Sequence, residues 1–170
     1  MSEALLSVRD LQVHFQVRVG GLLVGRYRPL KAVDGVDFDL KAGETLGIVG
    51  ESGCGKSTLG RAILRLIEPT GGRAVWLGEE LSSLDAAALR AKRQDMQIIF
   101  QDPLASLNPR MTVGEIIGEP LATFEPGIGR QAIRARVKEM MAKVGLLPQM
   151  INRYPHEFSG GQCQRLGIAR

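Results

Sequence analysis

One glycine-rich loop constrains the possible folds of this chain more than any other feature. Residues 50–57 read G-E-S-G-C-G-K-S and match the pattern G-x-x-x-x-G-K-[ST]. The apolar run Thr45–Val49 before the loop predicts a short strand in a sheet buried on both faces. The run Lys56–Ile67 after it predicts a helix, because its apolar residues recur with a helical period. A strand, a glycine loop and a helix in this order predict an α/β fold with a parallel core.

The residue types in the loop suit the phosphate groups of ATP. Backbone N–H groups can surround clustered negative charge only where side chains do not intrude, and glycine provides that access. Lys56 supplies an ammonium for the outer phosphates, the hydroxyl of Ser57 suits Mg²⁺, and the positive end of the following helix adds attraction. Glu51 is expected to contribute only its backbone, and Cys54 to be a small filler rather than a reactive thiol. The predicted ATP-phosphate site consists of Gly50, Glu51, Ser52, Gly53, Cys54, Gly55, Lys56, Ser57 and Thr58.

Composition narrows the class of protein. The chain of 170 residues is 44% hydrophobic and 24% charged, as ordinary soluble globular proteins are. No apolar run approaches the ~18 residues that a membrane span needs. The N-terminus lacks the basic patch and the apolar stretch of a secretory signal, so we expect a cytosolic chain. The spacing of the two cysteines, Cys54 and Cys163, predicts neither a disulfide nor a metal site.

The net charge of +4 leaves two interpretations open. A basic excess is typical of an ordinary solvated surface, and it also suits nucleic acid or an anionic membrane surface. Aromatic residues make up only 5% of the chain and do not interleave with the basic residues. We therefore expect no nucleic-acid partner that binds by stacking.

Periodicity predicts the remaining elements. An alternating pattern predicts a strand over Leu5–Val17 with a turn near Arg9–Asp10, and a loop that includes Gly25–Pro29 follows. The other predicted strands are Val33–Leu40, Ala74–Leu77 and Met96–Phe100. The other predicted helices are Leu84–Arg93, Thr112–Phe124 with Pro120 ending or bending it, and Arg130–Val144 with Gly145 at its C-cap.

Two further motifs carry chemistry. Gln101 ends a predicted buried strand, where its amide oxygen can face Mg²⁺ or an attacking water. Ser159, Gly160, Gly161 and Gln162 form a second glycine-rich helix start, with Ser159 as its N-cap. The sequence therefore predicts a second anion site far along the chain from the first.

Together these motifs resemble the nucleotide-binding subunits of ATP-binding cassette (ABC) transporters. The resemblance implies an α/β fold: a P-loop NTPase (RecA-like) core with an N-terminal antiparallel β subdomain and an α-helical signature subdomain. It makes 1–170 a partial ABC ATP-binding domain, with the β subdomain and Walker A core over 1–101 and the helical signature subdomain over 102–170. It assigns Gln101 to the Q-loop, and Ser159, Gly160, Gly161 and Gln162 to the signature that binds the ATP of a partner subunit. Phe158 stands where the family usually has leucine.

Three stretches narrow the resemblance to a subgroup. Residues 50–61, 100–117 and 154–162 are similar to the ATPases of dipeptide and oligopeptide importers, and Ser106–Arg110 is especially characteristic of them. The same resemblance implies that Phe15 stacks on adenine. The strand pattern also allows Phe15 to be a core residue, and both interpretations stay open.

The resemblance also implies how such a subunit works. Two ATPase subunits, identical or different, meet head to tail, and each ATP lies between the Walker A loop of one and the signature of the other. Closure drives two transmembrane permease subunits, which an extracytoplasmic substrate-binding protein supplies with peptide. The implied cofactors are ATP and Mg²⁺, with Mg²⁺ held by Ser57 and Gln101. The implied location is peripheral, on the cytoplasmic face of the inner membrane.

The sequence reaches Arg170 without the Walker B aspartate, catalytic glutamate or switch histidine of this family, and Asp102, Glu115 and Glu119 do not fit those motifs. We therefore expect the C-terminal part of the core to be missing. We expect the 170-residue chain alone to bind nucleotide weakly, to hydrolyse it poorly and to aggregate. Two alternatives stay open: a soluble ABC ATPase without permeases, and a short nucleotide-binding partner that does not hydrolyse ATP.

Overall fold

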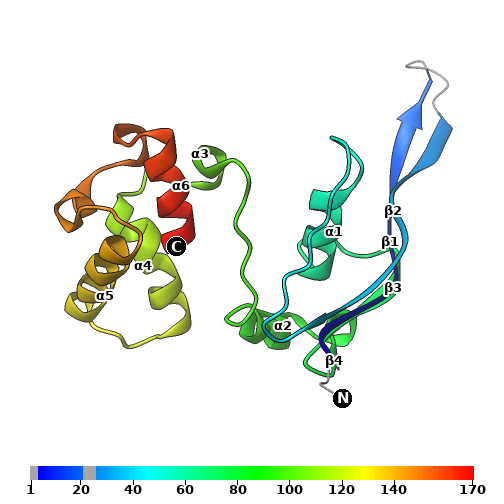
Figure 1. The fold of residues 1–170 in the computed structure, drawn as a ribbon, viewed down its shortest axis with the longest axis horizontal. Helices are drawn as coiled ribbons and strands as arrows, with labels where there is room; N and C mark the ends of the chain where they lie inside the picture. The colour runs from blue at the N-terminus through cyan, green and yellow to red at the C-terminus, as the bar shows by residue number, and fades with distance from the viewer. Residues whose placement is uncertain (1–3, 21–25) are drawn as a thin grey trace. The chain divides into compact units, whose positions relative to one another are not determined.

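The computed structural model describes residues 4–20 and 26–170. The chain forms two compact units, Met1–Met96 and Gln97–Arg170 (Figure 1). The first is built on an antiparallel sheet and the second is helical, as the resemblance implied. The subdomain boundary predicted after Gln101 lies a few residues beyond this division.

The sheet of the first unit has four strands in the order β2-β1-β3-β4, and all neighbours are antiparallel. The strands are β1 (Ala4–Val19), β2 (Arg26–Lys41), β3 (Gly71–Trp76) and β4 (Glu79–Glu80). Both β1 and β2 are longer than the sequence predicted, since β1 continues to Val19 and β2 already begins at Arg26. The loop predicted over Gly25–Pro29 is therefore wrong from Arg26 onward, and Gly25 lies outside the described residues.

A β-bulge in β1 changes which positions face the core. Leu6 and Val8 are buried before the bulge, and Leu11 and Val13 are buried after it. The register between β1 and β2 shifts between Val8 and Leu11, and Asp10 has a φ of 46°. An extra residue in one strand produces such a shift without ending the strand. The turn predicted at this place is therefore a bulge.

Helix α1 (Lys56–Ile63) covers the sheet through Leu59 and Ala62, both buried. The helix ends at Ile63, although its apolar period predicted an end at Ile67. Arg65, just beyond the end, has a φ of 49°, and its guanidinium donates to the carbonyls of Leu81 and Leu84 at 2.9 Å each. The core of this unit consists of Leu6, Val8, Leu11, Val13, Val33, Leu59, Ala62, Ala74, Leu81 and Met96. The unit also contains η1 (Leu81–Ser83) and α2 (Ala86–Lys92).

Two segments that the sequence predicted as strands are not strands. Thr45–Val49 and Met96–Phe100 have apolar sequences, but neither pairs with another strand in the described part of the chain. Ile48 is 47% exposed and Ile99 is 61% exposed. A strand forms only where a neighbour satisfies its backbone N–H and C=O groups, and these two segments lack that neighbour here. The described sheet accordingly contains no parallel pair.

The second unit packs its helices around one apolar core. Its elements are α3 (Pro103–Ser106), α4 (Val113–Phe124), α5 (Arg130–Lys143), η2 (Pro148–Asn152), η3 (Pro155–Glu157) and α6 (Gly160–Ala169). The core consists of Leu107, Val113, Ile116, Ile117, Val137, Met141, Leu146, Ile151, Phe158, Cys163, Leu166 and Ala169. Among the helices of the described residues, none combines the length and the apolar character that crossing a membrane requires.

Helices α4, α5 and α6 match the sequence predictions closely, whereas α3, η2 and η3 were not predicted. Gly145 follows α5 with a φ of 70°, and its N–H donates to the carbonyl of Ala142 at 3.0 Å, as expected of a C-cap. Pro120 lies inside α4 and does not end it. A proline removes one backbone bond, and the buried side chains of Val113, Ile116 and Ile117 hold α4 in place around that loss.

Two adjacent methionines of α5 test whether this core determines the stability of the second unit. Met141 is fully buried, whereas Met140 is 38% exposed. Met141→Ala should lower the free energy of unfolding by about 2–5 kcal/mol, because it leaves a cavity in the core. Met140→Ala should cost less than about 1 kcal/mol. Urea denaturation of both variants measures the difference, and equal losses would contradict this description of the core.

Candidate functional site

The side chain of Lys56 occupies the centre of the glycine-rich loop. Its Nζ donates to the carbonyl oxygens of Gly50 and Glu51 at 2.7 Å each, and it lies 3.4 Å from Sγ of Cys54. The N–H of Cys54 donates to the carbonyl of Glu51 at 3.4 Å. The loop therefore folds around an ammonium group, and Glu51 takes part through its backbone, as the sequence predicted.

The start of α1 presents free backbone N–H groups toward this loop. Gly55 is the N-cap, and the first bond within the helix runs from the N–H of Leu59 to the carbonyl of Gly55 at 2.8 Å. The N–H groups of Lys56, Ser57 and Thr58 consequently have no partner within the helix. No acidic residue lies in the first turn, so no carboxylate compensates the positive end of the helix dipole. This arrangement suits an anion.

A close backbone contact holds the loop against the sheet. Gly55 has a φ of 99°, and a Cβ at this position would lie 2.1 Å from the carbonyl oxygen of Ala32 in β2. It would also approach Val33, whose partner across the sheet is Val13 in β1. Only glycine permits this contact, because it has no Cβ. The contact brings the loop to the part of the sheet that carries Phe15, two positions beyond Val13 in β1.

Phe15 lies on β1 opposite Leu30 of β2 and is 38% exposed. It is not part of the buried core, so the interpretation of Phe15 as a core residue is wrong. An exposed ring at this place is available for stacking, and its contact with adenine stays a prediction.

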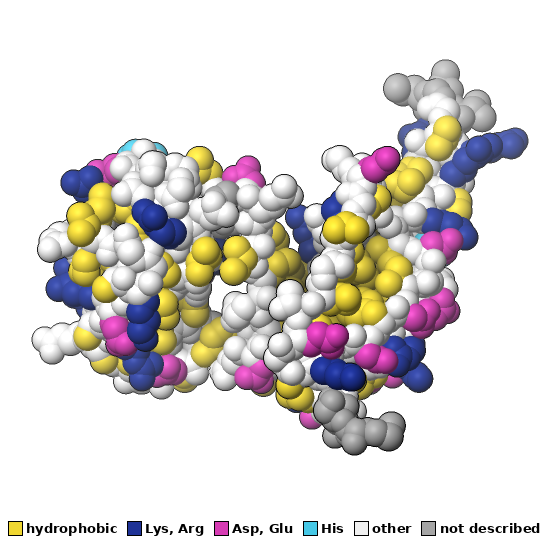
Figure 2. Space-filling model, in the orientation of Figure 1, with side chains coloured by type: hydrophobic (Ala, Val, Ile, Leu, Met, Phe, Trp, Pro, Cys, Tyr) yellow, Lys and Arg dark blue, Asp and Glu magenta, His cyan; other side chains and the backbone are white. Residues whose placement is uncertain are grey.

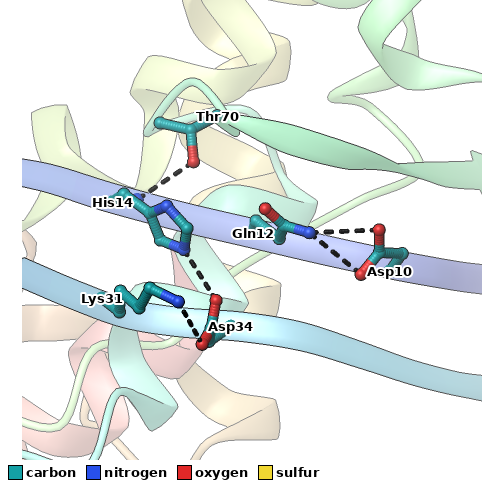
Figure 3. A network of polar contacts seen from close by, with 6 residues as sticks. All are labelled: Asp10, Gln12, His14, Lys31, Asp34 and Thr70. Carbon is teal, nitrogen blue, oxygen red and sulfur yellow. Dashed lines mark hydrogen bonds and ion pairs between the residues drawn. The ribbon is translucent and has the colours of Figure 1, made fainter. Parts of the chain in front are cut away.

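A polar network fixes the backbone of β1 next to Phe15 (Figure 3). The N–H of His14 donates to Oγ1 of Thr70 at 3.1 Å, and Nε2 of its ring lies 2.9 Å from Oδ1 of Asp34. Nζ of Lys31 donates to the other oxygen of Asp34 at 3.0 Å. The hydrogen bonds from Lys31 and His14 lower the pKa of Asp34 below its ordinary value. The network therefore ties β1, β2 and the segment before β3 together beside this ring.

The second glycine-rich motif begins α6 with a capping box. Oγ of Ser159 accepts from the N–H of Gln162 at 3.4 Å, and Oε1 of Gln162 accepts from the N–H of Ser159 at 2.9 Å. Gly160 and Gly161 are exposed, and a Cβ at either would meet open space. Since Ser159 accepts in the cap, its hydroxyl proton can still be donated to an anion.

Two buried residues anchor this motif in the second unit. Phe158 is 8% exposed and Cys163 is fully buried, and both belong to the helical core. The phenylalanine thus fills the apolar position where the sequence departs from the family pattern. Burial raises the pKa of the Cys163 thiol, so this cysteine acts as a core residue. Neither cysteine of the chain forms a disulfide.

Gln101 lies in the second unit, exposed, directly before α3. Of the predicted Mg²⁺ ligands, Ser57 belongs to the first unit and Gln101 to the second. The structure therefore places the loop and Phe15 in one unit and Gln101 and the signature in the other. The segment before Gln101 is not the buried strand that the sequence predicted.

Three acidic side chains near these motifs have structural roles. Asp102 caps α3 by accepting from the N–H of Ala105 at 3.1 Å, and Glu119 pairs with Arg170 at 3.4 Å. Glu115 accepts from the N–H and the hydroxyl of Thr112 at 2.7 and 2.8 Å, and these bonds lower its pKa below the ordinary value. None of the three is a candidate general base, in agreement with the sequence analysis.

Sequence reasoning missed the residues that support the site from the sheet. The carbonyl of Ala32 limits position 55 to glycine, and Thr70 and Asp34 hold the strand beside Phe15. These contacts join residues far apart in the chain. The position of a backbone carbonyl, moreover, cannot be inferred from the type of residue that carries it. A sequence pattern could not have found them.

Comparison with known proteins gives one family. The family model for ABC transporters matches residues 33–170. The chain is 61% identical to the oligopeptide transport ATP-binding protein OppF of Escherichia coli (strain K12) over 99% of its own length. It is 52% identical to the oligopeptide transport ATP-binding protein AppF of Bacillus subtilis (strain 168), again over 99%. The chain spans about half the length of these two relatives, 51% of each.

Solved structures show the same fold. The dimeric structure of a bacterial ABC transporter cassette matches 96% of this chain with a TM-score of 0.82 and 28% identity, and the match covers 67% of that cassette. A second dimeric structure, a post-hydrolysis state of an ATP-binding cassette bound to ADP and Pi, matches with a TM-score of 0.80 at the same identity and coverage.

The contact between Gly55 and Ala32 can be tested with a matched glycine. Gly43 has a similar left-handed φ of 76°, but a Cβ there would meet nothing within 4 Å. Gly43→Ala should cost only the backbone strain, roughly 1–2 kcal/mol, and should leave nucleotide affinity unchanged. Gly55→Ala should cost more and should weaken binding of a fluorescent ATP analogue by about tenfold or more, since it displaces the loop from the sheet. Equal effects of the two changes on affinity would show that the contact does not shape the site.

Proposed function

This chain belongs to the ABC transporter family, and from that premise we propose that it forms the nucleotide-binding part of a subunit that hydrolyses ATP to import oligopeptides. The observation that carries the proposal is the arrangement of Lys56 and the free N–H groups of α1 around one loop. The peptide substrate comes from the relatives, because OppF and AppF are both oligopeptide transport proteins.

The loop would bind the phosphates of ATP through three kinds of group. The N–H groups of Lys56, Ser57 and Thr58 point outward from the start of α1 and would donate to phosphate oxygens. The ammonium of Lys56 now bonds to two carbonyls, and a phosphate would offer it a charged acceptor instead. Phe15 would hold the adenine by stacking, supported by the network around His14.

Mg²⁺ fits the donors that this chain offers. Ser57 is exposed at the start of α1 and Gln101 is exposed before α3, and hydroxyl and amide oxygens are ligands that Mg²⁺ accepts. Bound there, the ion would neutralise charge on the outer phosphates. The chain itself would contribute the hydroxyl of Ser57 and the amide oxygen of Gln101.

The signature would serve the ATP of a second ATPase subunit. The exposed N–H groups of Gly160 and Gly161 and the hydroxyl of Ser159 form a donor set at the positive end of α6. The dimeric cassettes with the same fold support a pair of such subunits, identical or different. Two transmembrane permeases and an extracytoplasmic substrate-binding protein would complete the importer, with this subunit peripheral on the cytoplasmic face of the membrane.

The 170-residue chain alone would bind nucleotide better than it hydrolyses it. Hydrolysis needs a positioned general base, whose loss typically costs about 10²–10⁴-fold in rate. Asp102, Glu115 and Glu119 are engaged in caps and an ion pair, and Glu51 uses its carbonyl within the loop. Because these acidic side chains are engaged elsewhere, we infer that the described residues bind and position ATP and do not supply the general base.

Lys56→Ala tests the proposal in the complete subunit. The change removes a charge-assisted contact worth roughly 1.5–3 kcal/mol, so affinity for a fluorescent ATP analogue should fall about 10–100-fold. Lys138→Ala, which removes an exposed lysine on α5, is the control and should leave affinity unchanged. Unchanged binding in the Lys56 variant would end the proposal.

A further inference from the structure

The net positive charge of the chain lies in one short stretch. Residues 11–33 contain Arg18, Arg26, Arg28 and Lys31 and not one acidic residue. The chain has 22 Lys and Arg against 18 Asp and Glu, so the residues outside this stretch carry 18 of each sign. A charge excess concentrated in this way marks a surface for an anionic partner.

The structure turns this stretch into a two-stranded ribbon. Strand β3 pairs with β1 only from Leu6 to Gln12, so residues 14–19 of β1 pair only with residues 26–31 of β2. We call residues 14–19 and 26–31 the ribbon. Figure 1 shows it extending beyond β3, and all of its residues except the half-buried His14 are exposed.

Apolar side chains alternate with the arginines on the ribbon. Val17 is opposite Arg28 and Val19 is opposite Arg26, and directly opposed residues of an antiparallel pair share a face. Tyr27 is on the other face, opposite Arg18, and it is 69% exposed. Val17 and Val19 are 37% and 49% exposed. On the face that Figure 2 shows, basic and hydrophobic side chains follow each other along the ribbon.

Two of the ribbon's arginines form no ion pair among the described residues. Lys31 pairs with Asp34 at 3.0 Å, but Arg26 and Arg28 form no ion pair within residues 4–20 and 26–170. An anionic partner would therefore meet unpaired guanidinium groups beside exposed apolar side chains.

We propose that the ribbon binds the surface of a bilayer that contains anionic phospholipids. The interface of such a bilayer offers phosphate groups for Arg26 and Arg28, and next to them hydrocarbon for Val17 and Val19. Single-stranded nucleic acid would need several aromatic rings to stack on, and an acidic protein surface would leave the valines facing charge. A bilayer with anionic lipids matches both the basic and the apolar side chains of the ribbon.

The ribbon also carries Phe15, the ring proposed to stack on adenine, but the residues proposed to contact the bilayer are Val17, Val19, Arg26 and Arg28. These four residues have no part in the loop, the adenine contact or the signature, and they would place the first unit on the membrane. The bilayer contact therefore goes beyond the proposed function, and it can fail while that function holds.

Co-sedimentation of the complete protein with vesicles tests the proposal. The protein should bind vesicles of phosphatidylcholine mixed with phosphatidylglycerol and should not bind vesicles of phosphatidylcholine alone. In Arg26→Gln/Arg28→Gln binding should weaken on the order of tenfold or more, since each arginine near an anionic surface contributes about fivefold. Val17→Ser/Val19→Ser should weaken the part of the binding that survives at high salt, where charge is screened.

The matched control removes the same charge elsewhere. Arg90→Gln/Lys138→Gln takes two exposed cations from α2 and α5 and should leave vesicle binding unchanged. Affinity for a fluorescent ATP analogue should be unchanged in all three double variants, which separates this test from that of the proposed function.

Equal losses in the ribbon and control variants would overturn the proposal, because net charge alone would then account for binding. Absence of binding to anionic vesicles would overturn it as well, and loss of association with permease subunits in detergent would instead indicate a protein partner.

Discussion

The backbone N–H groups at the start of α1, which have no acceptor within the helix, are the feature on which the rest of the first unit depends. A helix that begins with glycine and has no acid in its first turn concentrates positive potential at one point. The ammonium of Lys56 lies in the same loop and is stabilised there by hydrogen bonds that it donates to the carbonyl oxygens of Gly50 and Glu51. The contact between Gly55 and Ala32 fixes the loop on the sheet. It thereby holds the Lys56 ammonium close to the positive end of α1, where both can attract an anion.

The features that the sequence predicted correctly depend on residues close together in the chain. The fold of the glycine-rich loop around Lys56, the Ser159 cap and the Gly145 C-cap each rest on bonds between residues a few positions apart. Residue type determines such contacts almost alone, so a pattern can find them. The division into a sheet-based unit and a helical unit was implied by the family resemblance, which itself rests on short motifs.

The features that the sequence did not predict depend on distant partners. The bulge at Asp10 comes from the fit of β1 to two neighbouring strands, and α1 ends early where Arg65 reaches Leu81 and Leu84. Thr45–Val49 and Met96–Phe100 have the composition of strands but no hydrogen-bonded neighbour in the described structure. Composition states what a strand would bury, and pairing decides whether the strand forms.

The end of β3 at Gly71, opposite Gln12, has a consequence for local stability. Beyond that point the backbone bonds of the ribbon can open without disturbing the buried residues of the sheet, because an isolated two-stranded hairpin is marginally stable in water. Amide protons of the ribbon should therefore exchange with solvent faster than those around Val8. A partner that orders the ribbon would slow this exchange locally. Hydrogen exchange at the ribbon amides would therefore report whether a partner is bound to the ribbon, without a change in the global fold.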